Sequence, residues 1–120
     1  KVLQPLPAIA LSTDAELTTC IGNDFSYEAI FSRQIEALGN PGDMLWAFST
    51  SGTSPNVLMA VDAAKGLGLT VVGFTGKKDS PLELQSDICL CANCDKTNHS
   101  QEIHELAYHI ICEMIDEHYN

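Results

Sequence analysis

Apolar and polar residues follow one another along the chain in blocks that predict strands and helices in turn. Apolar or β-branched runs of strand length occupy residues 7–11, 44–48, 70–75 and 87–92. Runs without regular polar alternation are typical of strands covered on both faces of a parallel sheet. The strands are separated by segments of helical spacing, so the pattern predicts an α/β fold.

Three substantial helices are expected between and after these strands. The first, over residues 27–38, carries an apolar stripe that stops at Gly39. The second follows Pro55, which suits the first turn of a helix, and the third, over residues 99–118, keeps one apolar face for three turns or more. A short helical turn is expected after Pro81, and a turn over residues 22–24, before the first helix.

The order of the elements predicts one domain over residues 1–120, a three-layer α/β/α sandwich of flavodoxin-like or Rossmann-like type. No linker, repeat or low-complexity tract divides it. A doubly wound sheet usually has about five strands, whereas four are expected here and Lys1 leads almost directly into the first. We therefore expect the N-terminal helices and the first strand–loop–helix unit of the domain to precede Lys1.

The balance of charged residues limits the classes of molecule that the chain is expected to bind. Six Lys and Arg residues stand against sixteen Asp and Glu residues, a formal net charge of −10, which argues against a general nucleic-acid surface. No apolar run approaches the roughly 20 residues that span a membrane, so no membrane partner is expected. The odd number of cysteines favours reduced thiols in the cytoplasm.

Three of the five cysteines, Cys89, Cys91 and Cys94, lie close together in the sequence. The two-residue gap between Cys91 and Cys94 is common at zinc sites, but no second pair follows at a familiar distance. Cys89 and Cys91 also alternate with Ile88 and Leu90 as in a buried strand. We interpret these cysteines as structural.

The strongest chemical signal is the loop Ser49-Thr50-Ser51-Gly52-Thr53-Ser54, in which five of six residues are Ser or Thr. It joins the carboxyl end of a strand to the start of a helix, where open α/β sheets bind ligands. Free N–H groups of the first helical turn attract an anion there, and hydroxyls add donors. An ordinary capped turn, with Ser54 as N-cap, is the alternative; because the loop has more hydroxyls than a cap needs, the pattern favours phosphate binding.

The last helix carries two further candidates, Gln101 and His109. Eight residues separate them, about 12 Å along the helix axis and about 80° around it, so they could meet at one substrate or metal only by leaning together or from different subunits. Taken alone, Gln101 with Asn98 resembles a capping box, and His109 resembles a hydrogen-bonded core histidine. His104 and His109 are five residues apart, one too many for a zinc-protease pair.

Together these motifs resemble a known family, the bacterial phosphoheptose isomerases of the sugar-isomerase (SIS) fold. The resemblance runs from about Pro7 to the C-terminus. Its motifs are Ile21-Gly22-Asn23-Asp24-Phe25, Ser49 to Asn56, Thr75-Gly76 and Gln101-Glu102-Ile103-His104. It implies conversion of sedoheptulose 7-phosphate to D-glycero-D-manno-heptose 7-phosphate through an enediol, for heptose biosynthesis, by a homotetramer with active sites shared between subunits.

The resemblance also implies roles for single residues. It matches phosphate-binding hydroxyls to Ser49, Thr50, Ser51 and Ser54, and sugar contacts to Asn23 and Asp24. Gln101 matches a catalytic contact to substrate and zinc. His109 matches a zinc ligand that also serves as acid and base.

Two features set this chain apart from the family pattern. The glycine-rich loop and the helix with the other metal ligands, a His and a Glu four apart, would lie before Lys1, so the 120 residues alone are expected to be inactive. Asn98 stands where an acidic residue is usual, and Thr53 where Asn is common. The alternatives are a non-catalytic SIS protein that senses a phosphosugar or binds the replication initiator, and an SIS isomerase for another phosphosugar.

Overall fold

The structure, a computed structural model that describes residues 4–120, is built around a parallel three-stranded sheet. Its strands, in the order β1-β2-β3, are β1 (Met44–Ser49), β2 (Thr70–Thr75) and β3 (Ile88–Cys91). Leu45 lies opposite Val71, and Val72 opposite Ile88. The three corresponding predicted strands are confirmed, and so is the α/β class.

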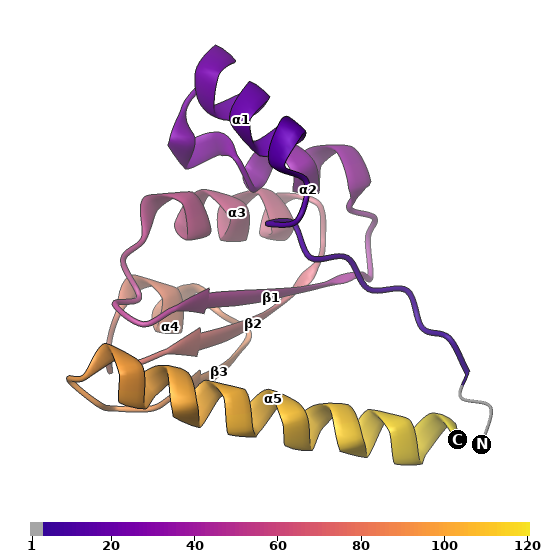
Figure 1. The fold of residues 1–120 in the computed structure, drawn as a ribbon, viewed down its shortest axis with the longest axis vertical. Coiled ribbons are helices and arrows are strands. Elements are labelled where there is room, and N and C mark those ends of the chain that lie inside the picture. The colour runs from indigo at the N-terminus through magenta and orange to yellow at the C-terminus, as the bar shows by residue number, and fades with distance from the viewer. Residues whose placement is uncertain (1–3) are drawn as a thin grey trace.

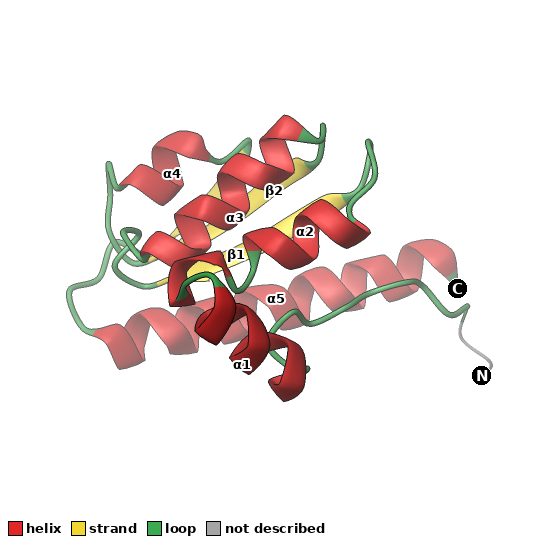
Figure 2. Cartoon of the chain, turned by 90° about the horizontal axis from the view of Figure 1, so that it is seen from above, coloured by secondary structure: helices red, strands yellow, loops and turns green. Residues whose placement is uncertain are grey.

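Helices cover both faces of this sheet (Figures 1 and 2). They are α1 (Ala15–Asp24), the 3-10 turn η1 (Tyr27–Ala29), α2 (Ser32–Leu38), α3 (Pro55–Gly66), α4 (Pro81–Gln85) and α5 (Thr97–Tyr119). α2, α3 and α4 lie on one side, with α1 beyond them, and α5 runs across the other side. This is the predicted three-layer sandwich. No helix within residues 4–120 is long and apolar enough to cross a membrane.

The main core lies between the sheet and the α3–α4 layer. Val61 and Ala64 of α3, Val71 of β2 and Leu82 of α4 are all fully buried. The β1–α3–β2 and β2–α4–β3 connections join parallel strands, so each crossover helix must fold back over the sheet. Burial of these aliphatic side chains fixes the helices on the strands and holds the strand ends in place.

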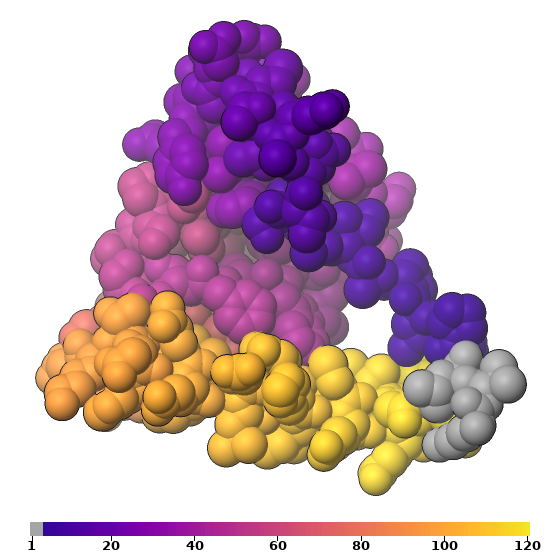
Figure 3. Space-filling model, in the orientation of Figure 1, coloured from indigo at the N-terminus to yellow at the C-terminus, as the bar shows by residue number. Residues whose placement is uncertain are grey.

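The predicted strand at residues 7–11 is wrong. The segment has no regular structure, Ile9 is 70% exposed, and the sheet has three strands within the described residues instead of four. An apolar run forms a strand only where a neighbour accepts its hydrogen bonds, and Pro7 has no N–H to donate. The chain just before this segment lies at the end of α5 instead (Figure 3), where the backbone N–H of Gln4 donates to Asn120 Oδ1 at 2.7 Å.

Residues 22–24 are helical, which corrects the predicted turn. They form the last turn of α1, a helix that the sequence interpretation missed. Asp14 caps its N-terminus by accepting a hydrogen bond from the N–H of Leu17 at 2.9 Å. Asp14 followed by apolar Leu17 and Ile21 is a recognisable helix start, so the signal was present.

The predicted helix over residues 27–38 is divided into η1 and α2. Ile30 and Ile35 of its apolar stripe are buried, whereas Tyr27 and Leu38 are exposed. At the division, the Gln34 side chain donates from Nε2 to the carbonyl of Ile30 at 2.8 Å. The stripe therefore identified two buried residues, Ile30 and Ile35, but neither its own exposed ends nor the break.

α5 presents a different face to the sheet from the one its apolar pattern suggested. Its two buried residues are the polar Ser100 and His104. Along the same face Ala107, Ile111 and Ile115 are half-buried. The remaining apolar residues, which we call the outer stripe, are 41–63% exposed: Ile103, Leu106, Ile110 and Met114.

Leu82 and Leu84 of α4 provide a matched test of this core. Leu82 is fully buried and Leu84 is 72% exposed. We expect Leu82→Ala to lower the free energy of unfolding by about 2–5 kcal/mol because it leaves a cavity, and Leu84→Ala to change it by less than about 0.5 kcal/mol. Denaturant unfolding of the two variants of the full-length protein measures both, and equal losses would contradict this packing.

Candidate functional site

The loop at residues 49–54 is held by its own hydroxyls. Ser49 Oγ lies 2.9 Å from Ser54 Oγ and 3.3 Å from Ser51 Oγ, and it accepts the N–H of Gly52 at 3.1 Å. Ser54 occupies the N-cap position of α3, but its side chain makes no capping hydrogen bond. The hydroxyl of Ser54 therefore faces the other loop hydroxyls, unlike that of an ordinary cap.

Two glycines allow the loop to approach its neighbours. Gly52 has a left-handed φ of +69°, and a Cβ there would overlap the Ser80 hydroxyl. Its carbonyl accepts the N–H of Leu82 at 3.0 Å. The N–H of Gly76, which follows β2, donates to the carbonyl of Thr50 at 3.0 Å. The turns after β1 and β2 are thus bonded directly to each other.

A cavity of about 500 Å³ lies between this loop and α5. Its lining residues are Phe48, Ser49, Thr50, Ser54, Gln101, His104, Glu105 and Tyr108. The structure therefore brings three of the four predicted phosphate-binding hydroxyls together with Gln101, across 47 or more residues of sequence. The three hydroxyls line the side of the cavity formed by the loop, and the carboxamide of Gln101 lines the side formed by α5.

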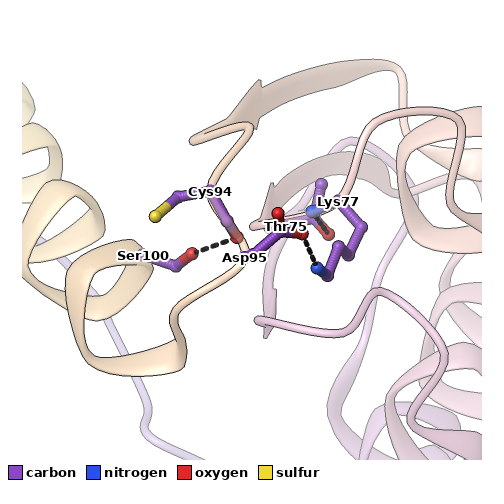
Figure 4. A network of polar contacts seen from close by, with 5 residues as sticks. All are labelled: Thr75, Lys77, Cys94, Asp95 and Ser100. Atoms are coloured by element: carbon purple, nitrogen blue, oxygen red, sulfur yellow. Dashed lines mark hydrogen bonds and ion pairs between the residues drawn. The ribbon is translucent and has the colours of Figure 1, made fainter.

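Ser51, the fourth hydroxyl, borders a smaller hollow of about 100 Å³ on the other side of the loop. Thr50 and Lys77 also line it. Figure 4 shows Lys77 reaching Asp95, with which it forms an ion pair. The hydrogen bond from Lys77, and then its charge, lower the pKa of the Asp95 carboxyl. Asp95 thus holds the ammonium group beside the loop.

Asn23 and Asp24, the predicted sugar contacts, do not lie at this cavity. Both are exposed on the last turn of α1, on the far side of α3 from α5 (Figure 1). Asn23 Nδ2 donates to Asp24 Oδ1 at 2.9 Å, and Asp24 also lies 3.5 Å from Cys20 Sγ. The hydrogen bond to Asp24, and then its charge, raise the pKa of the Cys20 thiol. The sugar-binding role of both residues stays a prediction.

His109 is also apart from the cavity. Its side chain is exposed, with its ring 4.7 Å from that of Tyr108, so the interpretation as a core histidine is wrong. The capping-box interpretation of Gln101 is wrong as well, because α5 begins earlier, with Lys96 at the N-cap. The eight-residue spacing separates the two side chains as the helix geometry requires.

The residues of this chain do not by themselves fit the predicted zinc ion. Within residues 4–120 no group of three His, Cys, Asp or Glu side chains is placed to hold a metal. Cys89, Cys91 and Cys94 are half-buried free thiols. Burial is the main cause that raises the pKa of Cys89, followed by the charges of Glu83 and Cys91. A raised thiol pKa disfavours the thiolate form of Cys89 that would bind metal. The structural interpretation of the three cysteines stays a prediction.

His104 is the cavity residue that the sequence interpretation missed. It is 4% exposed, and its Nε2 lies 3.0 Å from the carbonyl oxygen of Thr75 at the end of β2. It lies one helical turn after buried Ser100 and three residues after Gln101. His104 therefore lies where the sheet-facing side of α5 borders the cavity. The sequence signal for this residue is its place in the motif Gln101-Glu102-Ile103-His104, one helical turn after Ser100.

Comparison with models of known protein families identifies the family of this chain. The family model described as "SIS domain" matches residues 3–76, more than half of the chain. The chain belongs to the SIS-domain family. The matched region ends just after β2, so it includes Gly76 and the loop at residues 49–54, which we call the hydroxyl loop, but not α5.

Curated relatives extend the similarity through α5. The chain is 47% identical over 111 residues to the phosphoheptose isomerase of Roseiflexus sp. (strain RS-1), covering 92% of this chain and 56% of that protein. It is 46% identical over 112 residues to that of Nitratidesulfovibrio vulgaris, covering 93% and 54%. The chain therefore spans just over half the length of these relatives.

Solved structures agree on the fold. A phosphoheptose isomerase from Francisella tularensis superposes with a TM-score of 0.91 at 40% identity, covering 94% of this chain and 61% of that chain. One from Neisseria gonorrhoeae gives a TM-score of 0.89 at 38% identity, covering 91% and 61%. The α/β SIS fold is confirmed.

Substitution of Gly52 tests the loop geometry. We expect Gly52→Ala to lower the free energy of unfolding by more than about 1 kcal/mol, because a Cβ at this left-handed φ is strained and also lies 2.8 Å from Thr75 Oγ1. Gly66→Ala, in α3 with nothing within 4 Å of the added Cβ, should stabilise slightly. Denaturant unfolding distinguishes the two, and a Gly52→Ala protein as stable as the wild type would refute the geometry.

Proposed function

We propose that the full-length protein converts sedoheptulose 7-phosphate to D-glycero-D-manno-heptose 7-phosphate. The observation that carries this proposal is the cavity lined by Ser49, Thr50, Ser54 and Gln101, in a chain 46–47% identical to proteins named phosphoheptose isomerase. Because the chain spans just over half of those relatives, the activity is proposed for the whole protein and not for these 120 residues.

The loop is suited to the phosphate end of the substrate. Its hydroxyls and the start of α3 supply neutral donors, and the helix dipole adds a partial positive charge there. The described residues that line the larger cavity include no Lys or Arg. Hydroxyls that bond to one another, such as Ser49 and Ser54, can turn to phosphate oxygens without leaving a buried group unpaired.

The reaction moves a proton between C1 and C2 through an enediol. It needs a base to take the proton next to the carbonyl and a donor to stabilise the developing oxyanion. Gln101 lines the cavity and has a carboxamide N–H that can donate to this oxygen. His109 is proposed as the acid and base because an imidazole ring can both accept and donate a proton.

We propose a cytoplasmic homotetramer in which His109 serves a site completed by another subunit. His109 does not line the cavity of its own chain, whereas Gln101 does. The outer stripe of α5 supports a protein partner, because exposed apolar surface of this extent is typical of interfaces. The five free thiols are in keeping with a reducing compartment.

Two alternatives use the same cavity: a non-catalytic protein that senses a phosphosugar or binds the replication initiator, and an isomerase for another phosphosugar. The first predicts binding without turnover. The second predicts turnover of a substrate of different length or with an amino group. Turnover of sedoheptulose 7-phosphate tests the first alternative, and the same measurement with other phosphosugars tests the second.

The assay is turnover of sedoheptulose 7-phosphate by the full-length protein and by two neighbouring loop variants. Ser54→Ala should raise KM about tenfold by removing a hydrogen bond to a charged phosphate, without cost to α3, since Ser54 makes no capping bond. Thr53→Ala should leave KM unchanged, because Thr53 is exposed and outside the cavity. Binding without turnover, or turnover that Ser54→Ala does not alter, would count against the proposal.

Zinc remains a prediction from the family resemblance, with Gln101 and His109 as the ligands from this chain. We expect zinc in the purified full-length protein, detected by elemental analysis, with turnover lost on chelation and restored by zinc. Full activity in a protein shown to be free of metal would contradict it. Binding of inorganic phosphate serves as the control, since the loop needs no metal and should bind before and after chelation.

A further inference from the structure

Among residues 4–120, His104 is the one titratable side chain that is buried. It belongs to neither the predicted catalytic pair nor the phosphate loop. A buried polar ring costs stability unless its nitrogens are satisfied. The partners of its two nitrogens therefore define what the ring can do.

Nε2 of His104 is the nitrogen that carries a proton. It lies 3.0 Å from the carbonyl oxygen of Thr75, and a carbonyl oxygen can only accept, so Nε2 must donate. The same oxygen accepts the backbone N–H of Ala92 at 2.8 Å. In the neutral ring the proton on Nε2 leaves Nδ1 as an acceptor.

The ring is also fixed against rotation. It packs edge-on against Phe48 and Phe74, with ring centroids 6.4 and 5.8 Å away and planes inclined by 65° and 74°. Phe48 and Phe74 are themselves stacked at 4.3 Å. The aromatic contacts and the bond to Thr75 together hold Nδ1 in one direction.

Nδ1 has no protein partner within the described residues. Nδ1 is nevertheless not fully buried. Among the described residues, the fully buried side-chain nitrogen or oxygen atoms without a partner are Thr18 Oγ1 and Gln85 Oε1. His104 lines the cavity together with Gln101 and Ser54. Nδ1 is therefore available to a ligand in that cavity.

We propose that His104 is a binding residue of this site: Nδ1 accepts a hydrogen bond from a hydroxyl group of the bound sugar phosphate. This inference rests on the proposed function and adds a specificity-determining contact to it. The chemistry of Nδ1 selects the ligand group. A hydroxyl can donate to its lone pair, whereas an ionised phosphate has only acceptors and would be repelled.

Two substitutions separate this role from a purely structural one. In His104→Gln, the amide nitrogen lies at about the reach of imidazole Nε2 and can still donate to Thr75, but no acceptor replaces Nδ1. In His104→Asn, the shorter side chain loses the bond to Thr75. His118→Gln, in the exposed last turn of α5, is the control.

The experiment is calorimetric binding of sedoheptulose 7-phosphate and of inorganic phosphate to the full-length variants. We expect His104→Gln to keep the wild-type melting temperature and phosphate affinity but to bind the sugar phosphate about tenfold more weakly, as expected for one hydrogen bond. His104→Asn should also melt at a lower temperature. His118→Gln should match the wild type in all three quantities.

Monodeoxy analogues of the sugar phosphate identify the hydroxyl. The analogue that lacks it should bind the wild type more weakly and bind His104→Gln no more weakly than the parent sugar does. Equal sugar-phosphate affinity of the wild type and His104→Gln would overturn the proposal, as would equal losses for both ligands. If the wild type binds phosphate but no sugar phosphate, the proposed function fails and this contact with it.

Discussion

A close approach of three chain segments at the carboxyl ends of β1 and β2 sets the geometry of the whole site. Gly76 donates to the carbonyl of Thr50 at 3.0 Å and accepts the N–H of Cys94 at 2.9 Å. A Cβ at position 76 would lie 2.5 Å from Ser100 Oγ and 2.8 Å from the Thr50 carbonyl oxygen. Only glycine lets the hydroxyl loop, the end of β2 and the start of α5 meet there.

That contact explains how an acidic chain can offer a site to an anion. The side of the larger cavity near the start of α3 is lined by the hydroxyls of the loop, Glu105 lines the α5 side, and Lys77 is paired with Asp95 outside this cavity. Neutral donors that are already in place lose little on binding, whereas a flexible lysine must be ordered and desolvated. Salt screens most of the net charge of −10 beyond about 10 Å, so the donors nearest the loop contribute most to the potential that an anion would meet there.

The sequence predicted the features whose signal lies in a local run of residues, and it failed where a feature depends on a partner elsewhere in the fold. β1, β2, α3 and the hydroxyl loop each carry their signal in their own residues, as apolar runs, as Pro55 at a helix start and as clustered hydroxyls, and these local patterns were sufficient. The apolar run at residues 7–11 failed because a strand needs a partner, which local pattern does not show. The burial of His104 was missed because it depends on the Thr75 carbonyl, 29 residues away, and not on the periodicity of α5.

Helix geometry also explains why the candidate catalytic residues of this chain are divided. With about 100° per residue, Gln101 and Glu105 lie on the cavity side of α5, Ser100 and His104 toward the sheet, and His109 between the cavity side and the outer stripe. Any ligand that contacts Gln101 is therefore turned away from His109 of the same helix. His109 lies next to the exposed outer stripe of α5, so a subunit that packed on that stripe, as in the proposed tetramer, would lie beside His109.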